Sequence, residues 1–397
     1  ALDGRDARAF NYLAFSHRSL AQWELTHGRD PAEHIEKGIA AARKAVEAQP
    51  EMAAAHAGLG TAYLVLVHAR QSRGLDPTHA LESAAACYQK SIALDPKRVA
   101  SYTNLGNVWK SMAEVQVAQG ADPSGSVGNA AAAFEQAVHL NPQYAPAHNN
   151  LGNVQLTLGE YLLNRGSDPR QALADAARSY QRALAIKPDY GLARFNLGYT
   201  YRSLGEGLVD QGLDPGAALA AADAALGEYL RLNAADADAF LEQARVRLVV
   251  ARWELKRKAN PLVSLGQAAA DLHRAEAVNA KSPDVLFAQA QVARFEAEAA
   301  ADSSRAAPSL REGLNRVGRA LAINPGEGRY LALRGLLLYR TARLDSDPGR
   351  RREGARQAVA SLQAALKANP LLAREYGPVL ADARLDAGIT GPPPVKL

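Results

Sequence analysis

The sequence predicts an all-α solenoid, in which about eight helix-turn-helix repeats and a C-terminal capping helix stack into one domain. Punctuating residues recur along the 397-residue chain at a spacing of 46 residues. A period in this range is typical of stacked repeats. Alanine dominates the apolar residues and aromatic residues make up only 6% of the chain, which favours closely packed helices over strands.

The first punctuation is the tetrad Gly-x-Asp-Pro, which occurs five times. Glycine takes the left-handed conformation that follows a helix, aspartate caps the next helix, and proline fits its first turn. The tetrad therefore predicts a turn between two helices. Its prolines are Pro31, Pro77, Pro123, Pro169 and Pro215. The series continues at Asn260 with Pro261 and, in weaker form, at Pro308 and Pro348.

A second series of residues falls between these turns. Its members are Pro50, Pro96, Pro142, Pro188, Ala234, Ala280, Pro325 and Pro370. Proline cannot continue a helix, so each position closes one helical hairpin before the next. The two series together predict pairs of antiparallel helices of about 20 and about 17 residues.

These positions divide the chain into one solenoid domain over residues 1–390. The repeats are expected at residues 4–50, 51–96, 97–142, 143–188, 189–234, 235–280, 281–325 and 326–370, followed by a cap at 371–390. Residues 391–397 contain three prolines, and we expect them to form a disordered tail.

Small and large residues alternate on the predicted helix faces. The first helix of a repeat carries a Leu-Gly pair, as in Leu105 with Gly106, and the glycine permits a neighbouring helix to approach closely. The second helix carries an alanine followed four residues later by an aromatic residue, as in Ala130 and Phe134. Positions four apart share a helix face, so the small residues are expected to receive the large ones.

These residues resemble a tetratricopeptide repeat. One unit fills the family's signature positions in order with Tyr102, Leu105, Gly106, Trp109, Ala130, Phe134, Ala137 and Pro142. The usual unit has 34 residues, whereas this one has 46, with the additional residues between the two helices. The resemblance implies a right-handed superhelical solenoid whose concave groove binds peptide segments of partner proteins.

Nothing in the sequence indicates catalysis, a cofactor or a metal site. The single cysteine, Cys87, excludes an internal disulfide and a cysteine-based zinc site. The histidines lack the His-Glu-x-x-His spacing, and His56 and His148 occupy an aromatic position of the repeat. The chain also has no phosphate loop, nucleophile elbow or dinucleotide fingerprint. We therefore expect a protein that is not an enzyme.

Charge and hydropathy bear on the class of partner. The net charge is +5, but cations and anions alternate without a long basic block, so nucleic acid is not indicated. The short cluster Arg350–Arg352 is interpreted as a solvated helix end. No apolar run reaches the length of a membrane helix. We expect a soluble, cytoplasmic protein that binds a protein or peptide.

Polar residues recur on the first helices of successive repeats. Asparagine is a poor helix former, so its presence at fixed positions requires an explanation. Amide side chains on stacked helices would form a ladder that matches an extended peptide backbone, with cations one turn away for acidic groups. The predicted peptide-binding residues are Asn104, Asn107, Lys110, Asn150, Asn153, Asn196, Tyr199 and Arg202. Asparagine at these positions also belongs to the family consensus, so a purely structural role remains open.

Three functions are compatible with this sequence. The first is a scaffold that binds an extended peptide or a helix of a partner protein in the groove. The second is the regulatory or sensory region of a larger bacterial multidomain enzyme, such as a serine/threonine kinase, which the resemblance suggests. The third is a structural solenoid that associates with itself as a homo-oligomer.

Overall fold

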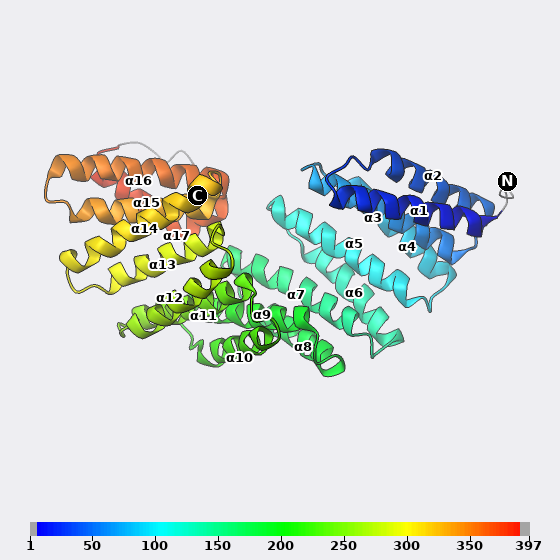
Figure 1. The fold of residues 1–397 in the computed structure, drawn as a ribbon, viewed down its shortest axis with the longest axis horizontal. Helices are drawn as coiled ribbons and strands as arrows, with labels where there is room; N and C mark the ends of the chain where they lie inside the picture. Colours follow the sequence, from blue (N-terminus) through cyan, green and yellow to red (C-terminus); the bar gives the residue numbers. More distant parts are fainter. Residues whose placement is uncertain (1–5, 390–397) are drawn as a thin grey trace. The chain divides into compact units, whose positions relative to one another are not determined.

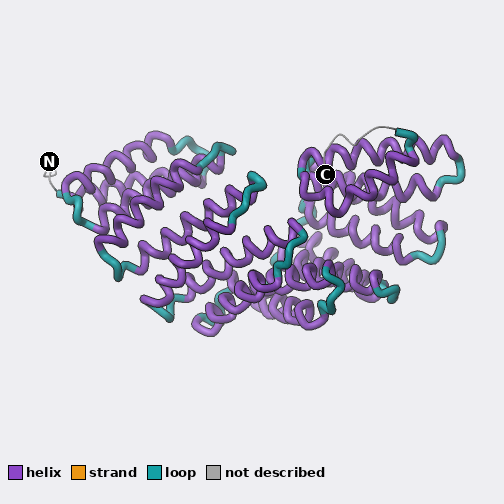
Figure 2. The backbone as a smooth tube through the Cα atoms, turned by 180° about the vertical axis from the view of Figure 1, so that it is seen from behind, coloured by secondary structure: helices purple, strands orange, loops and turns teal. Residues whose placement is uncertain are grey.

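The computed structural model describes residues 6–389, and the regular structure of this part is helical throughout (Figures 1 and 2). The predicted tail lies outside the described residues. The helices are α1 (Ala7–Thr26), α2 (Ala32–Ala48), α3 (Ala53–Ser72), α4 (Thr78–Leu94), α5 (Val99–Ala118), α6 (Ser124–Leu140), α7 (Ala145–Arg165), α8 (Arg170–Ile186), α9 (Gly191–Asp210), α10 (Gly216–Leu232), α11 (Ala237–Lys256), α12 (Leu262–Val278), α13 (Pro283–Ala299), α14 (Ser303–Ile323), α15 (Gly328–Leu344), α16 (Pro348–Ala368), the 3-10 turn η1 (Pro370–Leu372) and α17 (Ala373–Asp386).

The helices pack as consecutive antiparallel pairs, which confirms the predicted all-α repeat fold. α1 packs on α2, α3 on α4, and α5 on α6, while α1, α3 and α5 also pack side by side (Figure 1). α11 with α12, α13 with α14, and α15 with α16 repeat the arrangement. The chain divides into two compact units, Ala1–Leu162 with Gln171–Ala193 (unit 1) and Leu163–Arg170 with Arg194–Leu397 (unit 2). One continuous domain therefore stays a prediction.

The predicted turn chemistry is present at all five tetrads. Their glycines have positive φ angles between 67° and 74°, which an L side chain rarely adopts. The following aspartate accepts a hydrogen bond from the backbone N–H two residues later, for example Asp122 Oδ1 from Ser124 N at 2.9 Å. In the sixth repeat Lys258 replaces the glycine and still adopts a φ of 57°. The local sequence therefore dictates where each first helix ends.

The last two pairs differ from the prediction. α13 and α15 have 17 residues and α14 and α16 have 21, the reverse of the order in the first six pairs. Aspartates cap both long helices, since Asp302 accepts from Arg305 N at 3.0 Å and Asp347 from Arg350 N at 2.9 Å. Pro308 consequently lies inside α14 and does not mark the turn, because the cap at Asp302 starts the helix earlier.

The Leu-Gly positions form close contacts between paired helices. A Cβ atom built on Gly106 would lie 2.7 Å from the Phe134 ring, and one on Gly152 would lie 2.7 Å from the Tyr180 ring. Both rings are fully buried. Only glycine leaves room for an aromatic side chain at this distance, so the predicted small-against-large packing is confirmed.

The capping helix α17 packs on α16 and α15. Its Tyr376 and Leu380 are buried in a cluster with Leu336 and Leu362. This burial closes the apolar face that α16 would otherwise present to solvent.

Candidate protein-binding groove

The predicted asparagines of unit 1 lie on α5 and α7, and two of them meet. Asn150 Nδ2 donates to Asn107 Oδ1 at 3.2 Å, across the boundary between successive repeats. Asn150 Oδ1 accepts from Asn149 Nδ2 at 3.3 Å. All three side chains are buried or half-buried. The expected contact between amides of neighbouring first helices is therefore present.

Asn153 has a different environment, because it faces a buried tyrosine. The Tyr180 hydroxyl donates to Asn153 Oδ1 at 2.7 Å. Two repeats before Asn153, the equivalent residue of the α3–α4 pair is Thr61, and its hydroxyl lies 2.9 Å from the Tyr88 hydroxyl. A polar residue at this position thus satisfies the hydroxyl of the partner helix, which would otherwise be buried without a hydrogen bond.

Asn107 occupies the same position in the pair between them, but the aromatic residue of that pair is Phe134. Phenylalanine has no hydroxyl group for Asn107 to satisfy. The internal packing of the α5–α6 pair therefore does not require an amide at Asn107, and its Oδ1 is used by the neighbouring repeat instead.

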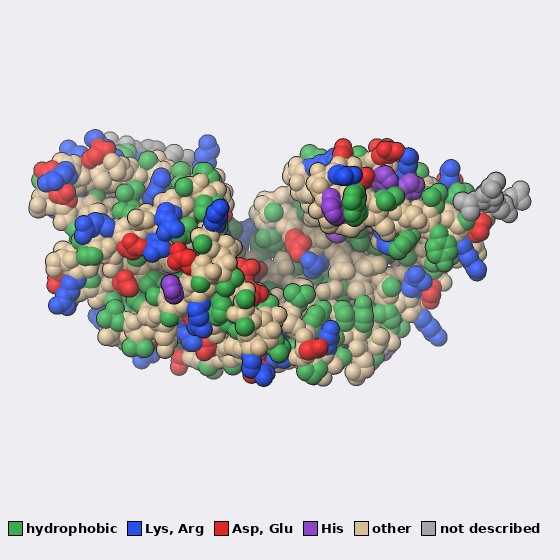
Figure 3. Space-filling view, viewed as in Figure 1, with side chains coloured by type: hydrophobic (Ala, Val, Ile, Leu, Met, Phe, Trp, Pro, Cys, Tyr) green, Lys and Arg blue, Asp and Glu red, His purple; other side chains and the backbone are tan. Residues whose placement is uncertain are grey.

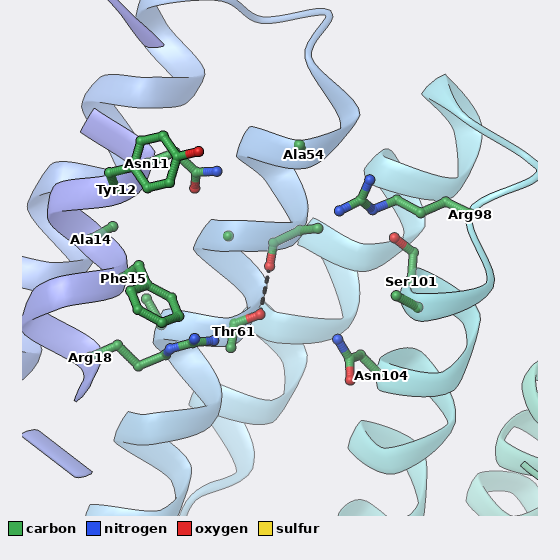
Figure 4. A pocket seen from close by; sticks show the side chains of 14 residues that line it. Asn11, Tyr12, Ala14, Phe15, Arg18, Ala54, Thr61, Arg98, Ser101 and Asn104 are labelled. Carbon is green, nitrogen blue, oxygen red and sulfur yellow. Dashed lines mark hydrogen bonds between the residues drawn. The ribbon is translucent and has the colours of Figure 1, made fainter. Parts of the chain in front are cut away.

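Asn104 lines a depression between α1, α3 and α5 (Figure 4). Its volume is about 320 Å³. The lining residues are Asn11, Tyr12, Ala14, Phe15, Arg18, Ala54, Ala57, Gly58, Thr61, Ala62, Arg98, Ala100, Ser101 and Asn104. We call this depression the α1–α3–α5 groove.

The groove has a floor of small residues and two unlike walls. Ala54, Ala57 and Gly58 of α3 form the floor, while Tyr12 and Phe15 of α1 form an aromatic wall on one side (Figure 4). Tyr12 is 75% exposed and Phe15 is 56% exposed. A chain segment lying on this floor could bring its backbone close to α3 while its apolar side chains contact the aromatic wall.

The opposite wall is polar and comes from α5. Figure 4 shows Arg98, just before α5, and Asn104, on α5, directed toward the space above α3. Asn104 makes no hydrogen bond to any described residue, although it is half-buried. The Nε atom of Arg98 is buried and likewise has no hydrogen-bond partner among the described residues. Polar atoms in this state are available to a ligand.

The charge of the groove is positive. Arg18 and Arg98 line it, and its lining includes no aspartate or glutamate. The Arg18 guanidinium lies 4.7 Å from the centre of the Phe15 ring, which holds the cation beside the aromatic wall. A carboxylate brought by a partner would therefore meet two cations whose charge no lining residue neutralises.

The sequence prediction missed Tyr12, Phe15 and Arg18, although a signal for them was available. They lie two 46-residue periods before Asn104, Asn107 and Lys110, and so occupy the equivalent positions of the first repeat. The prediction followed one residue type, asparagine, and did not follow the position along the repeats. Arg98 precedes α5 and has no counterpart in that pattern.

Lys110 is half-buried on α5 and already has an ionic partner. Its Nζ atom lies 2.6 Å from Glu114 Oε1, one helical turn further on. Such i,i+4 pairs on a helix surface are weak, about 0.3–0.5 kcal/mol, so an incoming carboxylate could replace Glu114 at little cost.

The remaining predicted residues, Asn196, Tyr199 and Arg202, lie on α9 in unit 2. Asn196 and Tyr199 are half-buried, and the Arg202 guanidinium lies 4.4 Å from the centre of the Tyr199 ring. Arg202 itself is only 5% exposed. This burial removes Arg202 from the side chains that a partner could contact.

Two carboxylates of unit 2 neutralise Arg202. Its Nε donates to Glu242 at 2.7 Å and its Nη1 donates to Glu206 at 2.7 Å. Burial acts to lower the pKa of Arg202, but Glu206 and Glu242 outweigh it and raise the pKa well above its ordinary value. Arg202 was expected to contact acidic side chains of a partner. Glu206 and Glu242 of this chain already occupy those contacts.

The charges continue along the first helices of unit 2 as a paired network. Arg245 Nη1 donates to Glu242 at 2.5 Å, and its Nη2 lies 3.7 Å from Asp284, which accepts from the Tyr330 hydroxyl at 2.8 Å. Burial acts to raise the pKa of Glu242, but its two arginines hold that pKa below its ordinary value. The charges that the sequence places at Glu242 and Arg245 thus compensate one another.

The described residues show no metal site, no membrane-spanning helix and no deprotonated thiol. Among residues 6–389, no group of three or more histidine, cysteine, aspartate or glutamate side chains is arranged to hold a metal ion. None of the described helices has the length and apolar character needed to cross a bilayer. Burial raises the pKa of the Cys87 thiol to about 11, which leaves it protonated at neutral pH.

The helix pairs and their turns define an α-solenoid of tetratricopeptide-like repeats. No family model and no curated protein matches the chain. Among solved structures it is similar to MamA, with 21% identity, a TM-score of 0.36, and coverage of 54% of this chain and 96% of that one. It is similar to a tetratricopeptide repeat protein from Parabacteroides merdae, with 11% identity, a TM-score of 0.49, and coverage of 82% and 99%.

A third similar structure is YrrB, described as a TPR protein with an unusual peptide-binding site. Its identity with this chain is 16% and its TM-score is 0.36, with coverage of 62% of this chain and 97% of YrrB.

Proposed function

We propose that this chain is a protein-binding scaffold whose α1–α3–α5 groove takes an extended, acidic segment of a partner protein. The observation that supports this most directly is the state of the polar wall. Asn104 and the Nε atom of Arg98 lack hydrogen-bond partners among the described residues, and no lining carboxylate neutralises Arg18 or Arg98. Leaving the buried Nε atom of Arg98 without a hydrogen bond is costly unless water or a ligand satisfies it.

The lining residues match the parts of an extended peptide. The amides of Asn11 and Asn104 offer both donors and acceptors for a peptide backbone. The small side chains of α3 permit that backbone to lie close to the helix. An apolar side chain of the partner would contact Tyr12 and Phe15, and an acidic side chain would pair with Arg98.

The volume limits how much of a partner this groove accommodates. About 320 Å³ is at the lower end of the range for binding pockets, which corresponds to a short stretch of chain. A longer segment would continue along α5 and α7, where Lys110 and the Asn107–Asn150 pair offer further polar contacts.

The test compares the full chain with the double variant Arg98→Ala, Asn104→Ala in selection from a phage-displayed library of short random peptides. We expect the selected peptides to contain acidic residues beside an apolar residue. Loss of a charge-assisted hydrogen bond and an amide contact should weaken their binding by about tenfold to a hundredfold.

The matched control is Arg311→Ala with Asn315→Ala, which removes the same two residue types from exposed positions on α14 in unit 2. This control should bind the selected peptides as the unchanged chain does. Equal binding by the chain and by the Arg98→Ala, Asn104→Ala variant would place peptide binding elsewhere and refute the proposal.

A further inference from the structure

The turn between α11 and α12 differs from the equivalent turns of the first five helix pairs. Leu262 and Val263 begin α12, and they are 55% and 71% exposed. The second of these two positions is exposed in all six pairs, so packing does not require an apolar side chain there. In the other five pairs the two positions hold small or polar residues, namely Ala32 and Glu33, Thr78 and His79, Ser124 and Gly125, Arg170 and Gln171, and Gly216 and Ala217.

Cations accompany the two aliphatic residues. Lys256, Arg257 and Lys258 are exposed, and none of them forms an ion pair with a described residue. Lys256 Nζ donates to the carbonyl oxygen of Val209 at 2.8 Å, which leaves its charge uncompensated. Asn260 stands where the other five turns have aspartate. Residues 256–263 therefore carry three cations and no carboxylate.

Lys258 occupies a backbone conformation that favours glycine. Its φ angle is 57°, and it is the one non-glycine residue with a positive φ among residues 6–389. A β-carbon is unfavourable in this region, so lysine destabilises the turn relative to the glycine of the other five pairs. The fold does not need a cation here, because glycine forms the same turn elsewhere in the chain. A residue that the turn itself disfavours indicates a role outside the fold.

A second turn at the same edge of unit 2 has a similar combination of residues. Figures 1 and 2 show the turns that follow α11, α13 and α15 on one side of this unit. The α15–α16 turn carries Leu344, which is 37% exposed, near the exposed Arg343, Arg351 and Arg352. These three arginines form no ion pair with a described residue, since the two aspartates of the turn pair with Arg350. Figure 3 shows hydrophobic and cationic side chains together along this edge.

We propose that this edge of unit 2 docks on an anionic membrane surface. Leu262, Val263 and Leu344 would enter the boundary between headgroups and acyl chains, while the neighbouring lysines and arginines contact lipid phosphates. Long basic side chains keep their charge among the headgroups while their methylene groups lie along apolar surface. Contact of this kind needs no helix that spans the bilayer.

A protruding turn suits a lipid surface better than it suits a peptide segment. Residues at a turn between two antiparallel helices offer a partner no facing walls, whereas the α1–α3–α5 groove has a floor and two walls. Two separate turns with the same sign of charge match a partner that is broad and uniformly negative. An acidic protein would need a complementary shape at both turns at once.

The test is co-sedimentation of the full chain with vesicles of phosphatidylcholine alone and with vesicles that contain an equal amount of phosphatidylglycerol. We expect binding to the anionic vesicles at low salt, and weaker binding as the salt concentration rises, because salt screens the attraction. The neutral vesicles should bind far less of the chain. Leu262→Ser with Val263→Ser should weaken binding to the anionic vesicles by about tenfold or more.

The matched control is Leu232→Ser with Val278→Ser, which removes the same two residue types from the opposite edge. Leu232 and Val278 end α10 and α12 and are 54% and 46% exposed. This control should bind the vesicles as the unchanged chain does. Lys258→Gly separates binding from folding, because it should weaken vesicle binding while it raises the midpoint of urea unfolding by relieving the positive φ.

Binding to the anionic vesicles that the Leu262→Ser, Val263→Ser variant loses and the control retains supports the proposal. The absence of binding to anionic vesicles overturns it, and so does an equal loss in the variant and the control. Equal binding to neutral and anionic vesicles also overturns it. The Arg98→Ala, Asn104→Ala variant should bind the vesicles unchanged, so failure of this test leaves the proposed groove intact. Loss of binding in that variant alone would place the membrane contact in the groove and overturn the docking of this edge.

Discussion

Replacement of Gly152 by alanine tests the central packing contact of the repeat. A Cβ atom at this position would lie 2.7 Å from Tyr180 Cε1 and 2.8 Å from Cζ. The Tyr180 side chain is fully buried, and its hydroxyl is held by Asn153 at 2.7 Å. The ring therefore cannot move away without losing this hydrogen bond.

Two effects decide the magnitude. Overpacking a buried site costs about 1–3 kcal/mol, while alanine gains about 1 kcal/mol over glycine in a helix interior. Gly128 provides the matched control, because it lies inside α6 with no atom within 4 Å of a built Cβ. The helix-propensity gain is common to both variants, so Gly152→Ala should be less stable than Gly128→Ala by about 1–3 kcal/mol.

Urea unfolding followed by far-UV circular dichroism gives the comparison of the two variants. Hydrogen exchange of the α7 and α8 amides shows whether the loss is local, as expected for an array in which each repeat contacts only its neighbours. Equal stability of Gly152→Ala and Gly128→Ala would refute the argument that the close contact with Tyr180 requires glycine.

Three further predictions concern the polar contacts and the thiol. Glu242→Gln should destabilise unit 2 by about 3 kcal/mol at neutral pH, since it removes the buried carboxylate that Arg202 and Arg245 share. Because the pKa of Glu242 is depressed in the folded chain, that loss should shrink as the pH falls below about 4. Urea unfolding at both pH values checks this, and Glu114→Gln, in an exposed pair, should change stability by less than about 0.5 kcal/mol. Asn153→Ala should cost about 1–3 kcal/mol by orphaning the Tyr180 hydroxyl, and much less in a Tyr180→Phe background; additive losses in a double-mutant cycle would contradict the contact. Cys87 should react with a maleimide in the folded chain far more slowly than in urea, because burial raises its pKa to about 11, and equal rates would contradict that burial.

The turns and helix lengths of the first six repeats were predictable because their causes are local. Glycine with a positive φ and aspartate before proline end one helix and begin the next within four residues. The last two pairs lack that glycine, and Pro308 was a misleading guide because it lies inside α14, whereas Pro348 begins α16 as predicted. Asp302 and Asp347 carried the correct signal for the starts of α14 and α16, but aspartate is too common for a single one to identify a cap.

The candidate site was only partly predictable. Asn104 was identified by residue type, whereas Arg98 was not, since a residue just before a helix contributes to a groove only through the way neighbouring helices stack. The burial of Arg202 could not be foreseen either. Its Glu242 partner lies 40 residues away, and a sequence does not reveal which of several carboxylates reaches a given cation.

The structural and ligand-binding explanations of the asparagines can be separated position by position. Where the second helix carries tyrosine, the facing residue forms a hydrogen bond with the tyrosine hydroxyl, as Asn153 does with Tyr180. Where the second helix carries phenylalanine, there is no hydroxyl for the facing Asn107 to bond, and Asn107 instead accepts a hydrogen bond from Asn150 in the next repeat. Asparagine at this one repeat position therefore has two different physical roles in two successive repeats. Asn104 and Asn107 of α5 make no side-chain hydrogen bond within their own repeat, and Asn104 lines the α1–α3–α5 groove together with Arg98.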